Sequence, residues 1–89
     1  MRTVEVTNQF RRDTDRLRKQ GRDRSRIERI VEHIAAHGQA PAHARPHKLS
    51  GEWDGSWECH IMFDWLLIYT IEPTRLILRR TGTHEDLFG

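Results

Sequence analysis

Three strand-like runs, one directly after another, fill the second half of the chain and limit most strongly the folds open to it. Residues 53–62 and 65–71 are rich in aromatic and β-branched residues, and residues 75–80 alternate large apolar side chains along the run. Together the first two runs exceed the usual length of one strand, so a break is expected near Phe63 and Asp64. A turn at residues 72–74 joins the last two. This half predicts an antiparallel sheet.

The first half predicts one short strand and then a helix. Residues 3–7 alternate valine with polar neighbours, which is typical of a strand. A helix follows, capped by Thr7 or Asn8 and ended by Gly21. Its few apolar residues form no continuous stripe, so packing against the rest of the protein must hold it.

A second helix is indicated more strongly, and it completes the predicted fold. Asp23 or Ser25 caps it, Gly38 closes it, and its apolar residues follow helical spacing: Ile27, Ile30, Val31, Ile34 and Ala35. Residues 39–46 contain two prolines and predict a loop. The order strand, helix, helix and three antiparallel strands predicts a small α+β fold, a single domain over residues 1–89 with both helices on one face of the sheet.

Composition places the chain among globular proteins and argues against several classes. Hydrophobic residues make up 36% and charged residues 31%, a balance unlike that of disordered chains. The single cysteine, Cys59, permits no internal disulfide, and we expect it to be a buried apolar filler. No apolar run is long enough to cross a membrane, and residues 1–5 lack the apolar part of a signal peptide. These features predict a cytoplasmic protein.

Charge is divided unevenly along the chain. Residues 1–46 hold eleven Lys and Arg against six Asp and Glu, whereas residues 47–89 hold four against seven. The formal charges are therefore +5 and −3. A basic half of this kind can contact phosphates, or it can be the solvated surface of arginine-rich helices. Charge alone leaves both readings open.

Histidines in the second half suggest acid–base chemistry on a phosphodiester. His47, His60 and His84 accompany Asp64, and Arg80 lies close to His84 in sequence. Imidazole readily gives and takes a proton near neutral pH, and arginine binds phosphate. By contrast, His33 and His37 have the spacing of a helical metal pair but no third ligand nearby, so we expect no metal and no cofactor.

Four short segments of the chain closely resemble motifs of the YafQ group of RelE-like toxins and follow in the same order. They are His47–Trp53, Glu58–Ile61, Asp64–Tyr69 and Arg80–Phe88. Members of that group are ribosome-dependent mRNA endonucleases of bacterial toxin–antitoxin pairs. The resemblance implies a RelE-like fold and a catalytic set of His47, His60, Asp64 and His84. It also implies that Trp65 and Phe88 help to bind the substrate, and from its charge we expect Arg80 to bind the substrate as well.

The chemistry of RNA cleavage suggests how the catalytic set works, and the resemblance further implies what the protein binds. We expect Asp64 and His84 to transfer protons while His47 and His60 contact the scissile phosphate, with no metal taking part. The expected partners are a cognate antitoxin, acidic and of ribbon-helix-helix type, and the ribosome with bound mRNA. DNA would be met only through the antitoxin, and no membrane is involved.

Two departures from the family pattern leave alternatives open. Trp57 stands where many relatives carry an arginine, and Met62-Phe63 replaces a pair that usually contains proline. One alternative is a catalytically weak toxin that acts mainly by antitoxin binding and autoregulation. Another is a non-catalytic ParE-like toxin that binds DNA gyrase, although such relatives lack the histidine set.

Overall fold

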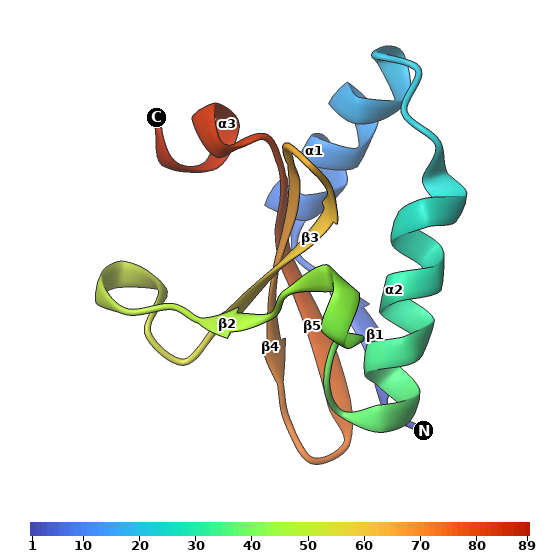
Figure 1. Cartoon of the computed structure of the whole chain (residues 1–89), viewed down its shortest axis with the longest axis vertical. Helices are drawn as coiled ribbons and strands as arrows, with labels where there is room; N and C mark the ends of the chain where they lie inside the picture. Colours follow the sequence, from blue (N-terminus) through green and yellow to red (C-terminus); the bar gives the residue numbers. More distant parts are fainter.

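A five-stranded sheet organises the molecule in the computed structural model, which describes residues 1–89 (Figure 1). The strands follow the order β1-β5-β4-β3-β2 across the sheet. Their bounds are β1 Thr3–Val6, β2 His47–Lys48, β3 Trp57–Met62, β4 Trp65–Ile71 and β5 Arg75–Gly82. The helices are α1 Asn8–Lys19, α2 Arg24–His37 and α3 His84–Phe88, with short 3-10 turns η1 Ala42–Ala44 and η2 Gly51–Trp53. The α+β class predicted from the sequence is confirmed.

The sheet is antiparallel except at one edge. β3, β4 and β5 pair antiparallel as predicted, but β1 runs parallel to β5, with Thr3 opposite Arg75 and Val6 opposite Leu78. A parallel pair needs a long connection, and the helices and the antiparallel strands together provide it. The sequence did not indicate this pairing, because β1 reads only as a short alternating segment.

The first of the three predicted runs, residues 53–62, begins later than expected, and a further short strand precedes it. Gly51–Trp53 form a 3-10 turn instead of strand, and Gly55 follows with φ of 90°, so β3 starts only at Trp57. His47 and Lys48 pair with Glu58 and Trp57 as the two-residue strand β2. Two residues are too few for any alternation to be read from sequence.

Both long helices pack on one face of the sheet, where the main core lies. The side chain of Thr7 accepts a hydrogen bond from the Phe10 amide and caps α1, and Asp23 caps α2 in the same manner. Gly38 ends α2 in the left-handed conformation, with φ of 75°. Apolar side chains of the two helices meet alternate residues of β4 and β5 in this core: Phe10, Leu17, Ile27, Ile30, Ile34, Leu67, Tyr69, Leu76 and Leu78.

The opposite face of the sheet carries a smaller cluster and the short helix α3. Leu66 and Ile68 point to this face and pack with Leu87 of α3, while Leu49 and Trp53 cover the cluster in part. Figure 1 shows α3 on the other side of the sheet from α2. No helix of the chain combines the length and apolar character needed to cross a membrane.

Candidate active site

Two cross-strand rows place the predicted site residues on the α3 face of the sheet. One row runs His47, Glu58, Ile68 and Arg80 across β2, β3, β4 and β5, and the other runs His60, Leu66 and Gly82. Residues directly opposite one another share a face, and the rows lie two residues, or about 7 Å, apart. The same pairing puts Trp57 opposite Tyr69, on the helical face and away from the histidines.

Asp64 and His84 form a direct contact at one end of this face. Asp64 lies in the turn between β3 and β4, and His84 is the first residue of α3. One carboxylate oxygen, Asp64 Oδ1, lies 3.0 Å from His84 Nδ1 and accepts the His84 backbone N–H at 3.2 Å. These two hydrogen bonds lower the pKa of Asp64 below its usual value, with the side-chain bond the larger cause. Asp64 is therefore ionised at neutral pH.

The contact with Asp64 also selects the form of His84. A carboxylate only accepts hydrogen bonds, so the Nδ1 that faces it carries the proton. The second ring nitrogen, Nε2, is then the atom that can meet a substrate. Both side chains are slightly more than half exposed, at 58% for His84 and 52% for Asp64, so a substrate can reach them.

His60 lies beside this pair on β3. Its ring centroid is 6.1 Å from that of His84, and the two planes are inclined by 55°. The Nδ1 atom of His60 is buried and has no hydrogen-bond partner in the chain. The residue as a whole is only half-buried, so part of it remains open to solvent.

His47 is held on the same face by a buried carboxylate. Its Nε2 lies 3.2 Å from Glu58 Oε1, and the Glu58 side chain is only 6% exposed. The two residues are direct partners between β2 and β3. His47 itself is 54% exposed, so the Glu58 contact leaves its other ring nitrogen available to a ligand.

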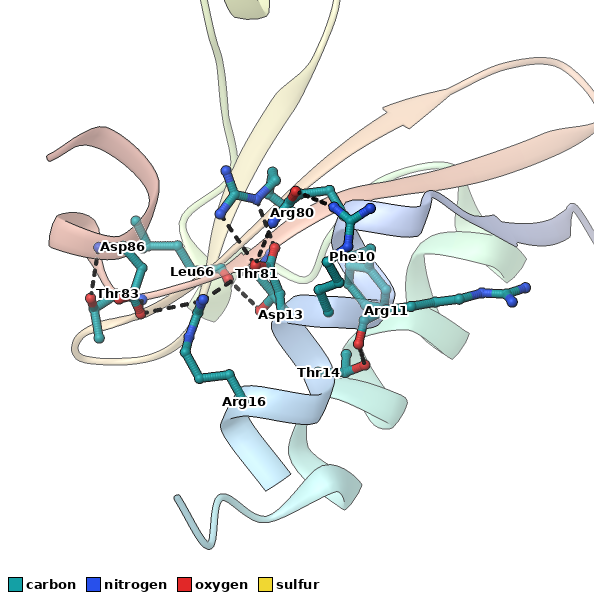
Figure 2. A network of polar contacts seen from close by, with 12 residues as sticks. Phe10, Arg11, Asp13, Thr14, Arg16, Leu66, Arg80, Thr81, Thr83 and Asp86 are labelled. Carbon is teal, nitrogen blue, oxygen red and sulfur yellow. Dashed lines mark hydrogen bonds and ion pairs between the residues drawn. The ribbon is translucent and has the colours of Figure 1, made fainter. Parts of the chain in front are cut away.

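Arg80 is tied to a buried aspartate of α1, as Figure 2 shows. Its Nε donates to Asp13 Oδ2 at 2.7 Å and its NH2 donates to Asp13 Oδ1 at 3.2 Å. The Thr81 amide, which lies beyond the end of β1, donates to the same carboxylate at 3.1 Å. Asp13 is fully buried, and bonds from Arg16 and Gln9 complete its hydrogen bonding. Arg80 keeps only its NH1 group without a partner in this network.

The other two residues predicted to bind substrate differ in exposure. Trp65 is only 2% exposed, and its Nε1 donates to the Thr81 hydroxyl at 2.9 Å, which in turn donates to the Leu66 carbonyl. Trp65 therefore supports the strand ends beneath the site. Phe88 is 49% exposed at the end of α3. The most exposed aromatic side chain is Phe63, at 92%, next to Asp64 in the β3–β4 turn.

Two side-chain groups lie outside this face. The ring centroids of His33 and His37 on α2 lie 4.5 Å apart with their planes tilted by 50°, and His33 Nδ1 lies 3.1 Å from the Gln39 carbonyl oxygen. No cluster of three or more potential metal-binding side chains occurs in the chain. Cys59 is buried as predicted, and its burial raises its thiol pKa to about 12.

Sequence reasoning missed Asp13 and Glu58, the two buried acids that hold Arg80 and His47. Asp13 stands in a helix rich in charge, where nothing distinguishes a buried acid from a solvated one. It also missed α3, although Thr83 and Asp86 have the spacing of a capping box. That signal was available and would have predicted a helix starting at His84.

Comparison with known proteins gives one consistent result. Residues 2–89 match a family described as a bacterial toxin of type II toxin–antitoxin system, YafQ. The chain is 32% identical to the mRNA interferase toxin YafQ of Escherichia coli strain K12, over 99% of this chain and 97% of that protein. It is similar to the crystal structure of the E. coli DinJ–YafQ complex, with a TM-score of 0.90, 31% identity and full coverage of both chains. A metal-bound toxin from Helicobacter pylori gives a TM-score of 0.90 and 32% identity over 99% of this chain and all of that one.

Proposed function

The chain belongs to the YafQ family of bacterial type II toxin–antitoxin toxins, and from this premise we infer that it is an mRNA interferase. Such an enzyme is an endoribonuclease that stops translation by cutting messenger RNA. The observation that carries the proposal is the Asp64–His84 contact, with His60 beside it on an accessible face. These residues supply the proton-transfer groups, and the proposed mechanism uses no metal ion.

The reaction follows from what RNA itself offers. A base takes the proton of the 2′-hydroxyl, the freed oxygen attacks the neighbouring phosphorus, and the bond from phosphorus to the 5′-oxygen breaks. An acid gives a proton to that departing oxygen, so the products are a 2′,3′-cyclic phosphate and a 5′-hydroxyl. Two proton-transfer groups must therefore approach one phosphate from different sides.

His84 is the proposed acid, with the proton on Nε2. The ionised Asp64 orients the ring and stabilises the imidazolium form, as a carboxylate does for histidine elsewhere. Because the lowered pKa of Asp64 makes it a weak base, we assign it this orienting role in place of the proton transfer expected from the sequence.

His60 is the proposed base, in place of the phosphate contact expected from the sequence, because its ring lies 6.1 Å from that of His84 and both rings can therefore reach one phosphate. His47, oriented by Glu58, contacts the phosphate from the strand edge. Arg80 contributes positive charge through NH1 and stabilises the charge that develops on phosphorus. Phe88 and Trp65 complete the site, the first at its surface and the second beneath it.

The partner that neutralises the toxin is a cognate antitoxin, by analogy with the DinJ–YafQ complex. We propose that it is acidic, of ribbon-helix-helix type, and that it lies along the basic helices. A groove of about 490 Å³ runs between α1, α2 and the sheet. Its lining includes the buried Phe10, Leu17 and Ile27, and its charged residues are three arginines and two glutamates: Arg18, Arg22, Arg24, Glu28 and Glu32. A segment that alternates apolar and acidic residues suits this lining.

The ribosome with bound mRNA is the proposed setting for cleavage, in the cytoplasm. Exposed arginines of α1 and α2 provide the positive charge needed to track ribosomal RNA phosphates. DNA is met only through the antitoxin.

Pulsed expression without antitoxin tests the function directly. Growth should stop, and primer extension should find new 5′ ends inside translated messages. Cleavage of the same message by purified toxin should require added ribosomes. Intact transcripts at confirmed soluble expression would rule out the interferase, and equal cutting without ribosomes would remove the ribosome from the proposal.

A further inference from the structure

The helix that carries His84 is too short to hold its own position. α3 has five residues, and Leu87 is the only one of them that is buried. An isolated helix of this length is not stable in water. The position of His84 over Asp64 therefore depends on contacts between α3 and other elements.

Arg16 of α1 makes one such contact. Its NH2 lies 3.6 Å from Asp86 of α3 and 3.3 Å from the buried Asp13 of its own helix (Figure 2). The Arg16 guanidinium thus links the buried Asp13 of α1 to Asp86 on the short helix α3. The Arg16 side chain is 39% exposed, and its Nε is buried.

Asp86 links that bridge to the start of α3. Its Oδ2 accepts the Thr83 amide at 3.0 Å, and the Thr83 hydroxyl accepts the Asp86 amide at 3.1 Å, which together form a capping box. The residue that follows Thr83 is His84. Movement of Asp86 therefore moves the turn from which His84 projects.

The Arg16–Asp86 bridge packs closely against Gly82 at the end of β5. A Cβ atom added to Gly82 would meet Asp86 Oδ2 at 2.9 Å and Arg16 NH2 at 3.1 Å. Both charged groups lie directly against the backbone at the end of β5. The bridge is therefore built into the strand-to-helix junction rather than lying on open surface.

We propose that Arg16 is a positioning residue for cleavage: through Asp86 it holds α3 so that His84 stays in contact with Asp64. The inference rests on the proposed role of His84. It predicts that losing the Arg16–Asp86 bridge disorders His84 while the fold remains intact.

Two variants break the bridge in different ways, and one variant retains its charge. Arg16→Met removes the guanidinium but keeps an unbranched side chain. Asp86→Asn keeps an oxygen to cap α3 and removes the charge that Arg16 meets. Arg16→Lys keeps a positive charge and should therefore retain part of the cleavage rate that Arg16→Met loses. Arg75→Met is the matched control, because Arg75 is exposed to a similar degree, pairs with Glu5 at 2.9 Å and with Glu72, and touches neither Asp13 nor α3.

Two measurements are made on each variant. The first is the single-turnover cleavage rate on ribosome-bound mRNA at saturating toxin, and the second is the ¹⁵N NMR signal of the His84 ring. Arg16→Met and Asp86→Asn should lower the rate by about 10-fold to 100-fold, the effect of misplacing a catalytic group by about 1 Å. In both, the His84 Nδ1 signal should lose the signature of a hydrogen-bonded N–H. Arg75→Met should match the wild type in both measurements.

The outcomes separate this inference from the proposed function. If Arg16→Met leaves the His84 signal and the rate unchanged, the positioning role is overturned. A lower rate with an unchanged His84 signal also overturns it, because Arg16 would then act elsewhere. If the wild type cuts no RNA, the function fails, but the NMR comparison still decides whether Arg16 holds His84 in place.

Discussion

The two faces of the sheet differ in what their side chains do. The helical face buries the main core of fourteen residues and shows arginines to solvent, whereas the α3 face buries a cluster of three and carries every predicted catalytic residue. Burial of apolar area is the main source of stability, and titratable groups need water and substrate access to react. The fold therefore separates stability from chemistry by placing them on opposite sides of one sheet.

Asp13 is the point at which the two faces meet. It lies on α1, yet it binds Arg80 from the site face and the open backbone edge of β5. It therefore contributes both to folding and to the geometry of the site. Substitutions ranked by the size of their effect test how complete the separation of the faces is.

The largest effect is expected at the centre of the site face. Replacing His84 with Gln should lower the single-turnover cleavage rate by on the order of 10² to 10⁴ because the proton donor is lost. The midpoint of thermal unfolding should stay near that of the wild type, since His84 is exposed. Cleavage at the wild-type rate would mean that another histidine, His47 or His60, donates the proton.

Asp13→Ala should cost about 3–5 kcal/mol in the free energy of unfolding, because it leaves the buried part of Arg80 without its partner. Urea denaturation followed by circular dichroism measures this loss. Arg18→Ala serves as the control, as its ion pair with Asp15 is exposed on both sides and should contribute little. A loss for Asp13→Ala no larger than that for Arg18→Ala would show that the Asp13–Arg80 contact does not stabilise the fold.

Phe63 should influence which sites are cut rather than how fast the chemistry runs. Its ring is 92% exposed next to Asp64, and an aromatic face can stack on an unpaired base with about 1–3 kcal/mol. Phe63→Ser should therefore change the relative use of cleavage sites, as mapped by sequencing of 5′ ends. An unchanged cleavage map would assign the exposed ring no part in recognition.

Charge reversal on the helical face should affect binding and not catalysis. Arg18→Glu combined with Arg26→Glu should slow association with the antitoxin about tenfold at low salt, with the difference shrinking above about 0.15 M ionic strength. Arg22 is left in place because its guanidinium lies 5.6 Å above the Trp65 ring, close to the site. Arg45→Glu, outside both helices, is the control. Salt-independent association would make the basic helices ordinary solvated surface and would direct the search for the antitoxin contact to the α3 face.

The smallest effect concerns the titration of Asp64. His84→Ala should raise the Asp64 pKa toward 3.8, because the larger of its two stabilising hydrogen bonds is removed. The pKa of Asp64 is lower in the folded protein than in the unfolded chain, so the contact with His84 contributes stability at pH values above the unfolded pKa. That contribution is lost as the pH falls through the folded pKa. Carbon NMR of the Asp64 carboxyl measures the shift, and an unchanged pKa would contradict the hydrogen bond.

The sequence predicted the helical face better than the site face, for a physical reason. α2 shows its apolar residues at helical spacing and ends at Gly38, so a local pattern contains the whole element. Arg80 illustrates the opposite case: its type suggested phosphate binding, but most of its bonding goes to Asp13, which lies 67 positions earlier in the chain. Pairings over such distances leave no local pattern, and the same holds for β1 with β5.

That parallel pair also sets the order in which the protein can assemble. β1 ends the sheet by joining residues 3–6 to residues 75–78, whereas β3, β4 and β5 meet through short turns. Local contacts close faster than distant ones because less chain entropy is lost at once. During synthesis, the arginine-rich helical segment is therefore exposed before β5, the strand that pairs with β1, has been made. The catalytic face forms only after β5 has left the ribosome.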